Sequence, residues 1–89
     1  MATYKVEFVK SAQKEFDRLA ATLQVKTAAA LSLLAQNPFS ELLKVKKLKG
    51  NDNLYRIRLG DYRILYEIRH EHLIVLVIKI GHRREVYRR

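Results

Sequence analysis

Residues 54–66 have the sequence Leu54-Tyr55-Arg56-Ile57-Arg58-Leu59-Gly60-Asp61-Tyr62-Arg63-Ile64-Leu65-Tyr66. Aromatic and aliphatic residues recur at every second position on both sides of Gly60-Asp61. This pattern is typical of two strands joined by a two-residue hairpin turn. This register places Arg58 directly opposite Arg63, with Arg56 on the same face. Like charges directly across a strand pair repel each other, so the sequence predicts that this face holds an anion.

The size and composition of the chain predict one small folded domain over residues 1–89. With 48% hydrophobic and 30% charged residues, the chain is unlike a disordered tail. The absence of cysteine excludes disulfides and thiolate metal sites and fits a cytoplasmic protein. The longest apolar stretch, residues 73–78, is too short to cross a bilayer, so no membrane association is expected.

The formal net charge of +9 is concentrated in the C-terminal half. Residues 1–43 hold five Lys and Arg against four Asp and Glu, whereas residues 44–89 hold thirteen against five. A field of one sign on one part of a small domain concentrates a polyanion and speeds its capture. The distribution therefore favours a nucleic-acid partner over a basic surface that only confers solubility.

The N-terminal half predicts a strand over residues 4–9 followed by two helices. Ser11 is a suitable N-cap, and apolar residues recur at helical spacing as far as Leu23. A second helix is expected over residues 24–36, because Pro38 disfavours helical geometry just before it. The helices should form a hairpin, since one continuous helix would exceed the diameter of so small a domain.

From residue 44 onward the pattern changes from helices to strands. A lysine-rich segment, residues 44–49, leads through a turn into strand candidates at residues 54–59, 62–69 and 73–80. The order predicts an α+β fold in which an antiparallel sheet meander carries both helices on one face. The helix residues expected to cover that face are Phe16, Leu19, Leu31 and Leu34.

The second hairpin of this meander is expected to turn at His70-Glu71. That turn would place Tyr66 opposite Val75 and Ile64 opposite Val77 on the covered face. The other face would then carry the arginines beside apolar side chains. Charge-assisted contacts to phosphate are stronger on such a partly desolvated surface than in open water.

Five segments together resemble the RelE/ParE toxin superfamily, and its RelE branch in particular. They are Lys47-Leu48-Lys49-Gly50, residues 55–59, residues 62–66, residues 75–78 and Gly81-His82-Arg83-Arg84-Glu85-Val86-Tyr87. The resemblance covers essentially the whole chain. It implies a RelE-like fold and a bacterial or archaeal toxin of a type II toxin-antitoxin system that cleaves messenger RNA in the ribosomal A site.

The resemblance also implies partners and site residues. The implied partners are the ribosome, messenger RNA and a cognate RelB-like antitoxin, and the basic charge favours an antitoxin with an acidic or amphipathic helical segment. Carried over by position, the implied catalytic residues are Arg56, Arg58, Arg63, Arg83 and Tyr87. The further residues expected to contact RNA are Lys47, Lys49 and Arg84.

The chemistry of such a site requires no metal. RNA supplies its own nucleophile, the 2′-hydroxyl, so the protein has to align it with the phosphate and stabilise the phosphorane. Arginine stays protonated and forks onto phosphate oxygens, which suits Arg56 and Arg63 to transition-state stabilisation. Arg83 would stabilise or protonate the leaving 5′-oxygen, and Tyr87 would stack on a base or orient the nucleophile. The expected products are a 2′,3′-cyclic phosphate and a 5′-hydroxyl.

The group that removes the 2′-hydroxyl proton is not evident from the sequence. Members of the RelE branch often have lysine at the strand positions, whereas Arg58 is almost never deprotonated. His82 and Tyr87 are therefore the candidate acids or bases. His70 and His72 have a strand-like spacing without an evident third ligand, so neither a metal nor a cofactor is expected.

Two other functions fit parts of the pattern. The first is a ParE-like toxin that poisons DNA gyrase on the same scaffold, although the arginine and tyrosine set favours RNA cleavage. The second is a non-catalytic RNA-binding module, whose binding would fall steeply with salt while the RNA stays intact.

Overall fold

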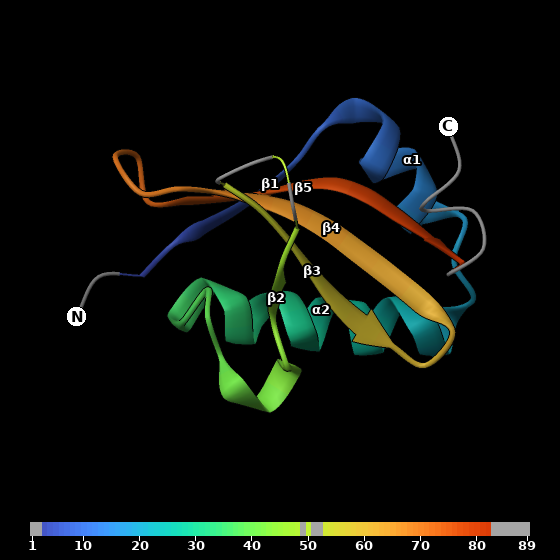
Figure 1. Cartoon of the computed structure of the whole chain (residues 1–89). Helices are drawn as coiled ribbons and strands as arrows, with labels where there is room; N and C mark the ends of the chain where they lie inside the picture. The colour runs from blue at the N-terminus through green and yellow to red at the C-terminus, as the bar shows by residue number, and fades with distance from the viewer. Residues whose placement is uncertain (1–2, 49, 51–52, 83–89) are drawn as a thin grey trace.

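The computed structural model describes residues 3–48, 50 and 53–82, which form two α-helices, a short 3₁₀ helix and a five-stranded sheet (Figure 1). This arrangement confirms the predicted α+β class. The elements are β1 (Lys5–Phe8), α1 (Lys10–Asp17), α2 (Ala21–Gln36), η1 (Glu41–Leu43), β2 (Lys46–Lys47), β3 (Leu54–Leu59), β4 (Tyr62–Arg69) and β5 (Ile74–His82). Neither α-helix is long and apolar enough to cross a membrane.

The sheet is mixed rather than wholly antiparallel. Its strand order is β1-β5-β4-β3-β2, and the pairs from β2 to β5 form the expected antiparallel meander. Strand β1 instead pairs in parallel with β5. A parallel pair needs a long crossover connection, which the two helices and the remaining strands supply here.

The first hairpin has the predicted register. Leu59 lies opposite Tyr62 and Arg58 opposite Arg63, so the two arginines face each other across the strands. Gly60 opens the turn with a φ of 62°, a left-handed conformation that glycine adopts without a steric penalty. The turn chemistry and the alternation therefore agree on one register.

The second hairpin does not have the predicted register. Tyr66 lies opposite Val77 rather than Val75, and Ile64 lies opposite Ile80. The prediction was wrong because the turn spans residues 70–73 rather than two residues, and because the pairing slips at a bulge next to Tyr66. Both changes preserve which face of β4 is covered.

The helices break earlier in the chain than expected. Ser11 lies inside α1 rather than at its N-cap, and α1 ends at Asp17 instead of continuing to Leu23. Gln24 lies inside α2, where its Nε2 donates hydrogen bonds to the carbonyl oxygens of Phe16 (3.0 Å) and Asp17 (3.3 Å). A side chain of the second helix thus satisfies carbonyls that the end of the first leaves free.

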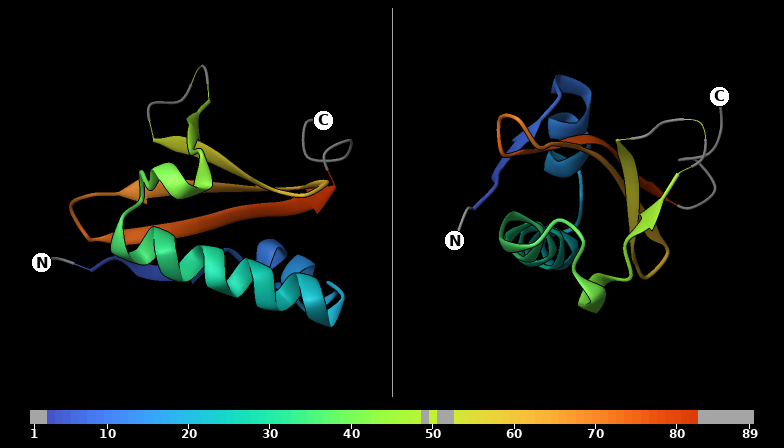
Figure 2. Two further views of the ribbon diagram at one scale, coloured as in Figure 1. Left: turned by 90° about the horizontal axis from the view of Figure 1, so that it is seen from below. Right: turned by 60° about the vertical axis from the view of Figure 1, so that its left-hand side comes forward.

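The core lies between the helices and one face of the sheet. The left view of Figure 2 shows α2 running alongside β5, with α1 near the start of α2. As predicted, Leu31 and Leu34 are buried and Phe16 and Leu19 pack against the same cluster. The sheet contributes the buried residues Ile57, Ile64, Tyr66, Ile68, Val75, Val77 and Ile80.

Tyr66 is the largest fully buried side chain of this core. Its hydroxyl donates a hydrogen bond to the carbonyl oxygen of Pro38 over 2.9 Å. Burial, with a smaller contribution from Tyr55, raises the pKa of Tyr66 above its ordinary value. The neutral phenol therefore ties the segment after α2 to the centre of the sheet.

Candidate nucleic-acid interface

On the sheet face opposite the core, four cations lie together on β2, β3 and the start of β4. Arg58 lies opposite Arg63 on β3 and β4, and Lys46 on β2 lies opposite Arg56. We call this set of Lys46, Arg56, Arg58 and Arg63 the arginine face. Each of these two cross-strand pairs brings like charges together, which destabilises the sheet unless an anion binds between them.

Two of the arginines are buried although they carry a charge. Arg56 is 9% exposed and Arg63 is 7% exposed, whereas Arg58 is exposed. The half-buried Leu65 lies opposite Arg56, so part of the border is apolar. A guanidinium with little access to water interacts more strongly with a phosphate than one in open solvent.

Arg63 retains hydrogen-bond donors that a ligand could use. Its Nη1 lies 3.3 Å from the carbonyl oxygen of Tyr62 and 3.5 Å from that of Gly60, which steadies the side chain at the hairpin turn. Its Nε is buried and has no hydrogen-bond partner within the described part of the chain. Guanidinium carries five N–H donors, so an anion at this position would satisfy groups that are costly to leave unpaired.

A small hollow lies beside β3 and includes two of these arginines. It has a volume of about 360 Å³, and its lining includes Arg56, Arg58 and Lys44 together with the apolar Leu42 and Leu43. The arginine face therefore continues into a recess that also carries a cation from the segment after η1. A recess that combines positive charge with apolar walls suits the charged backbone of a nucleic acid.

The structure separates the lysines that the sequence grouped together. Lys47 pairs with Tyr55 and so belongs to the opposite face, whereas Lys46 belongs to the arginine face. Lys46 and Lys44 also lie near the arginines, although the sequence did not predict them as site residues. Side chains alternate between the two faces of a strand, so the pairing of β2 with β3 is needed to place Lys46 on the arginine face.

His82 lies at the end of β5, next to the residue that pairs with Arg63. It ends β5 opposite Tyr62, and the two rings meet edge to face with centroids 5.8 Å apart. Tyr62 belongs to the face that α2 covers, and Gly81 occupies the position opposite Arg63. His82 therefore lies one position beyond the residue opposite Arg63.

Four expected site residues lie outside the described residues. They are Lys49, Arg83, Arg84 and Tyr87. Among the residues that the structure does describe, no group of three or more His, Asp or Glu is arranged to hold a metal ion. His70 instead meets the Tyr4 hydroxyl at 2.9 Å and stacks on Phe39.

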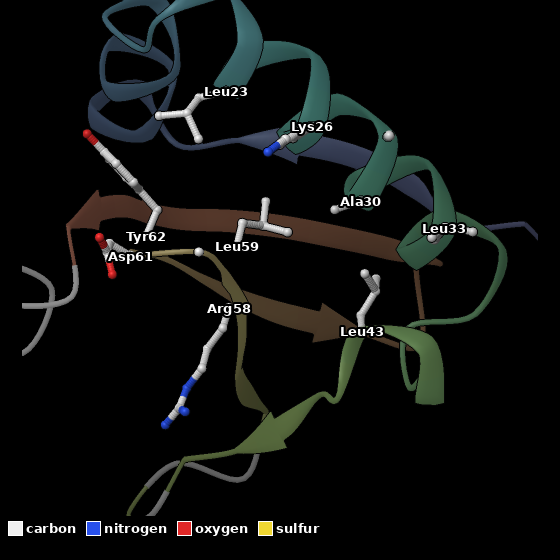
Figure 3. Close-up of a pocket in the computed structure, with 11 residues that line it drawn as sticks. Leu23, Lys26, Ala30, Leu33, Leu43, Arg58, Leu59, Asp61 and Tyr62 are labelled. Atoms are coloured by element: carbon white, nitrogen blue, oxygen red, sulfur yellow. The ribbon is translucent and has the colours of Figure 1, made fainter.

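A second hollow lies on the other side of the hairpin, between α2 and the β3–β4 turn (Figure 3). We call it the α2 groove; its volume is about 610 Å³. Leu59 points into it from the sheet, while the neighbouring Arg58 points away toward β2 (Figure 3). Its remaining walls are mainly apolar and include Leu23, Ala30, Leu33 and Leu43, while Lys26, Arg58 and Asp61 are its charged lining residues.

With this geometry established, comparison with known proteins identifies the family. A family model described as the ParE toxin of the type II toxin-antitoxin system, parDE, matches residues 6–87. The chain belongs to the RelE/ParE toxin family. The resemblance found in the sequence is therefore confirmed, and the chain is a toxin of the type II toxin-antitoxin class.

Relatives of this toxin carry RelE names. It is 30% identical over 86 residues to the putative toxin RelE1 of Methanocaldococcus jannaschii, covering 96% of each chain. It is 31% identical over 88 residues to the mRNA interferase toxin RelE of Escherichia coli, covering 94% of this chain and 90% of that one. It is also 30% identical over 88 residues to the toxin RelG of Mycobacterium tuberculosis, covering 97% and 98%.

Solved structures agree with the fold. The archaeal RelE-RelB complex from Pyrococcus horikoshii contains a chain that matches with a TM-score of 0.81 at 29% identity, over 93% of this toxin and 98% of that chain. The isolated E. coli RelE toxin matches with a TM-score of 0.79 at 32% identity, over 94% and 90%. The RelE-like architecture predicted from the sequence is confirmed.

Proposed function

We propose that this toxin is an endoribonuclease that cleaves messenger RNA in the ribosomal A site. The observation that carries the proposal is the burial of Arg56 and Arg63 on one sheet face, beside the exposed Arg58. Buried guanidiniums opposite other cations are unfavourable in the free protein and favourable with a phosphate bound. Relatives named mRNA interferase, such as E. coli RelE, support RNA as the substrate.

The reaction follows from what the substrate itself supplies. The 2′-oxygen of one nucleotide attacks the adjacent phosphorus and loses its proton, while the bond from phosphorus to the 5′-oxygen breaks and that oxygen gains a proton. The products are a 2′,3′-cyclic phosphate and a 5′-hydroxyl. Because the nucleophile comes from RNA and the arginines supply positive charge, no metal has a required role.

The arginines divide the binding and stabilisation of the reacting RNA among them. Arg56 and Arg63 bind the phosphate oxygens and stabilise the phosphorane, since their guanidiniums are buried where charge interactions are strongest. The exposed Arg58 binds the adjacent RNA backbone. Arg83 stabilises the leaving 5′-oxygen, and Tyr87 stacks on a base or takes the 2′-hydroxyl proton. His82, whose ring contacts Tyr62, is with Tyr87 a candidate acid or base.

RNA cleavage by the purified toxin in a translating extract tests the proposal. Primer extension should map cuts within codons of the translated message, with 5′-hydroxyl ends on the downstream fragments. Arg63→Gln should lower the cleavage rate about 100-fold to 1,000-fold, the effect of removing one donor to a developing anion. The matched control is Arg69→Gln, because Arg69 is an exposed arginine of the same strand that pairs with Glu67.

The outcomes separate an endoribonuclease from an RNA-binding module. Cleavage retained in Arg63→Gln but lost in Arg69→Gln would contradict the assignment of the arginine face. Salt-dependent binding of intact RNA without any cuts would identify a binding module instead of an enzyme.

Gyrase poisoning is the second candidate function, and one observation favours it: the matching family model describes ParE toxins. A supercoiling assay with purified gyrase tests it directly. Inhibition of supercoiling by the wild type, undiminished in Arg63→Gln, would support gyrase as the target. An unaffected gyrase together with cut messenger RNA would remove this candidate.

The partner that neutralises the toxin is an antitoxin with an acidic amphipathic helix, which binds in the α2 groove. The RelE relatives from P. horikoshii and E. coli form complexes with RelB. The groove offers apolar walls such as Leu33 and Leu59, and the whole of α2 contains one cation, Lys26, and no acidic residue. An apolar helix face flanked by Asp and Glu complements these walls.

Two charge substitutions on α2 test this placement. Leu33 lines the groove and is 36% exposed, whereas Val25 is 70% exposed and does not line it. Leu33→Asp should reduce co-purification with a co-expressed RelB-like antitoxin at least tenfold, about the effect of 1.4 kcal/mol in binding. Val25→Asp should leave it unchanged. Equal loss in both variants would place the antitoxin elsewhere.

A further inference from the structure

Strand β5 has two halves with different neighbours. From Ile74 to Val77 it pairs with β1, and the last contact is the hydrogen bond from the Val9 N–H to the Val77 carbonyl oxygen (3.0 Å). The chain then turns away into α1. In the described chain, no strand pairs with this edge of β5 beyond Val77.

The unpaired half of β5 is the half that adjoins the candidate site. Gly81 lies opposite Arg63, and His82 lies opposite Tyr62 at the hairpin turn. The pairing of β4 with β5 also slips at a bulge just before this half. A strand end with a bulge at one side and an open edge at the other needs another contact to hold its position.

Glu15 of α1 supplies that contact. Its Oε1 accepts a hydrogen bond from the Ile80 N–H over 2.9 Å, and its Oε2 lies 3.0 Å from Nζ of Lys79. The Glu15 side chain is 27% exposed, so water only partly competes with these contacts. One carboxylate thus takes the place of a neighbouring strand, and its hydrogen bond to the backbone is charge-assisted.

We infer that Glu15 is a positioning residue for the RNA-cleaving site. By holding the Ile80 N–H, it fixes the end of β5 and with it the backbone of Gly81 beside Arg63. This inference rests on the proposed function. Displacing a catalytic group by about 1 Å lowers rates by as much as 100-fold, so a distant anchor of this kind has a measurable effect.

The two oxygens of Glu15 can be tested separately. Glu15→Ala removes both contacts, Glu15→Gln keeps an acceptor for the Ile80 N–H, and Lys79→Met removes only the ion pair. We expect Glu15→Ala to lower kcat for RNA cleavage about tenfold to 100-fold, with KM within about twofold. Glu15→Gln and Lys79→Met should each retain activity within about fivefold, because both keep the contact to Ile80.

Asp17 provides the matched control. It is an exposed carboxylate of the same helix whose side chain accepts a hydrogen bond from Gln13. Asp17→Ala should leave kcat unchanged, and urea unfolding should show that each variant is folded under assay conditions. An equal loss of kcat in Glu15→Gln and Glu15→Ala, or no loss in Glu15→Ala, would overturn the inference.

Nuclear magnetic resonance supplies a readout that does not depend on activity. In Glu15→Ala the Ile80 amide should exchange with solvent at least about tenfold faster, and the Gly81 amide and Arg63 Nε resonances should shift. Unchanged resonances would overturn the inference even if RNA cleavage fell. If the wild type cut no RNA, the proposed function would fail, and the Arg63 resonance would still decide whether Glu15 positions that side chain.

Discussion

The two faces of the β3–β4 hairpin both bury side chains, but of opposite kinds. On the helix-covered face, Ile57 and Ile64 are fully buried opposite each other. On the arginine face, Arg56 and Arg63 are 9% and 7% exposed although they carry charge. Burial of the isoleucines stabilises the fold, whereas burial of the arginines opposes it. The helix-covered face therefore specifies the structure, whereas the arginine face carries buried charge, which fits the proposed binding of RNA.

The largest expected effect comes from the helix-covered face. Ile64→Ala should lower the free energy of unfolding by about 2–5 kcal/mol, because it removes a fully buried side chain and leaves a cavity. Urea denaturation measures this change. Leu65→Ala, at the neighbouring half-buried position on the other face, should cost less; a larger loss there would reverse the comparison.

A second test of the helix-covered face uses the pH dependence of stability. Folding raises the pKa of Tyr66 from its ordinary value of 10.0, so above about pH 10 the unfolded chain releases a proton that the folded chain keeps. The free energy of unfolding therefore keeps the full contribution of Tyr66 below about pH 10. Above that pH the contribution falls by up to about 1.4 kcal/mol per pH unit.

Tyr66→Phe should remove this part of the alkaline decline. It should also cost about 1–3 kcal/mol at neutral pH, because the Pro38 carbonyl loses its hydrogen bond. Urea denaturation at pH 7 and above pH 10 measures both effects. An alkaline slope as steep as that of the wild type would assign the decline to other tyrosines.

Removing a charge from the arginine face should increase the free energy of unfolding rather than decrease it. Arg58→Gln removes the repulsion across the strands from Arg63 and should raise the free energy of unfolding by about 0.2–1 kcal/mol. The gain should shrink at high salt, which screens exposed charges. Arg69→Gln, which loses an ion pair with Glu67, should not stabilise the protein. Destabilisation by Arg58→Gln would show that the face is structural.

The smallest expected effect distinguishes two adjacent lysines. Lys46 belongs to the arginine face and Lys47 to the opposite face. Lys46→Gln should reduce the slope of log affinity for single-stranded RNA against log salt by about 0.7, whereas Lys47→Gln should reduce it less. Fluorescence anisotropy over a salt series measures both slopes. A greater change from Lys47 would contradict the division into faces.

The first hairpin was predictable because its signals are local. Alternation assigned Arg58 and Arg63 to one face, and Gly60 marked a turn whose length fixed their pairing. The second hairpin was not, because its longer turn moves the partner of Tyr66 from Val75 to Val77, and a bulge then shifts the pairing further, so that Ile64 lies opposite Ile80. A bulge depends on neighbouring strands and has no reliable signature in one strand.

The candidate site was likewise only partly predictable. Alternation placed Arg56, Arg58 and Arg63 together, but Lys46 and Lys47 could be told apart only once β2 was paired with β3. Glu15 was missed because α1 and β5 meet only in the folded chain. No periodicity connects residues so far apart.

The α+β class, the first hairpin and the family could be read from the sequence alone, because they depend on local alternation, turn residues and the order of segments along the chain. The parallel pairing of β1 with β5, the register of the second hairpin and the contact between Glu15 and Ile80 arise only in the folded chain. These depend on how distant segments share one core. Packing among segments, rather than the preference of any one segment, selects among such arrangements.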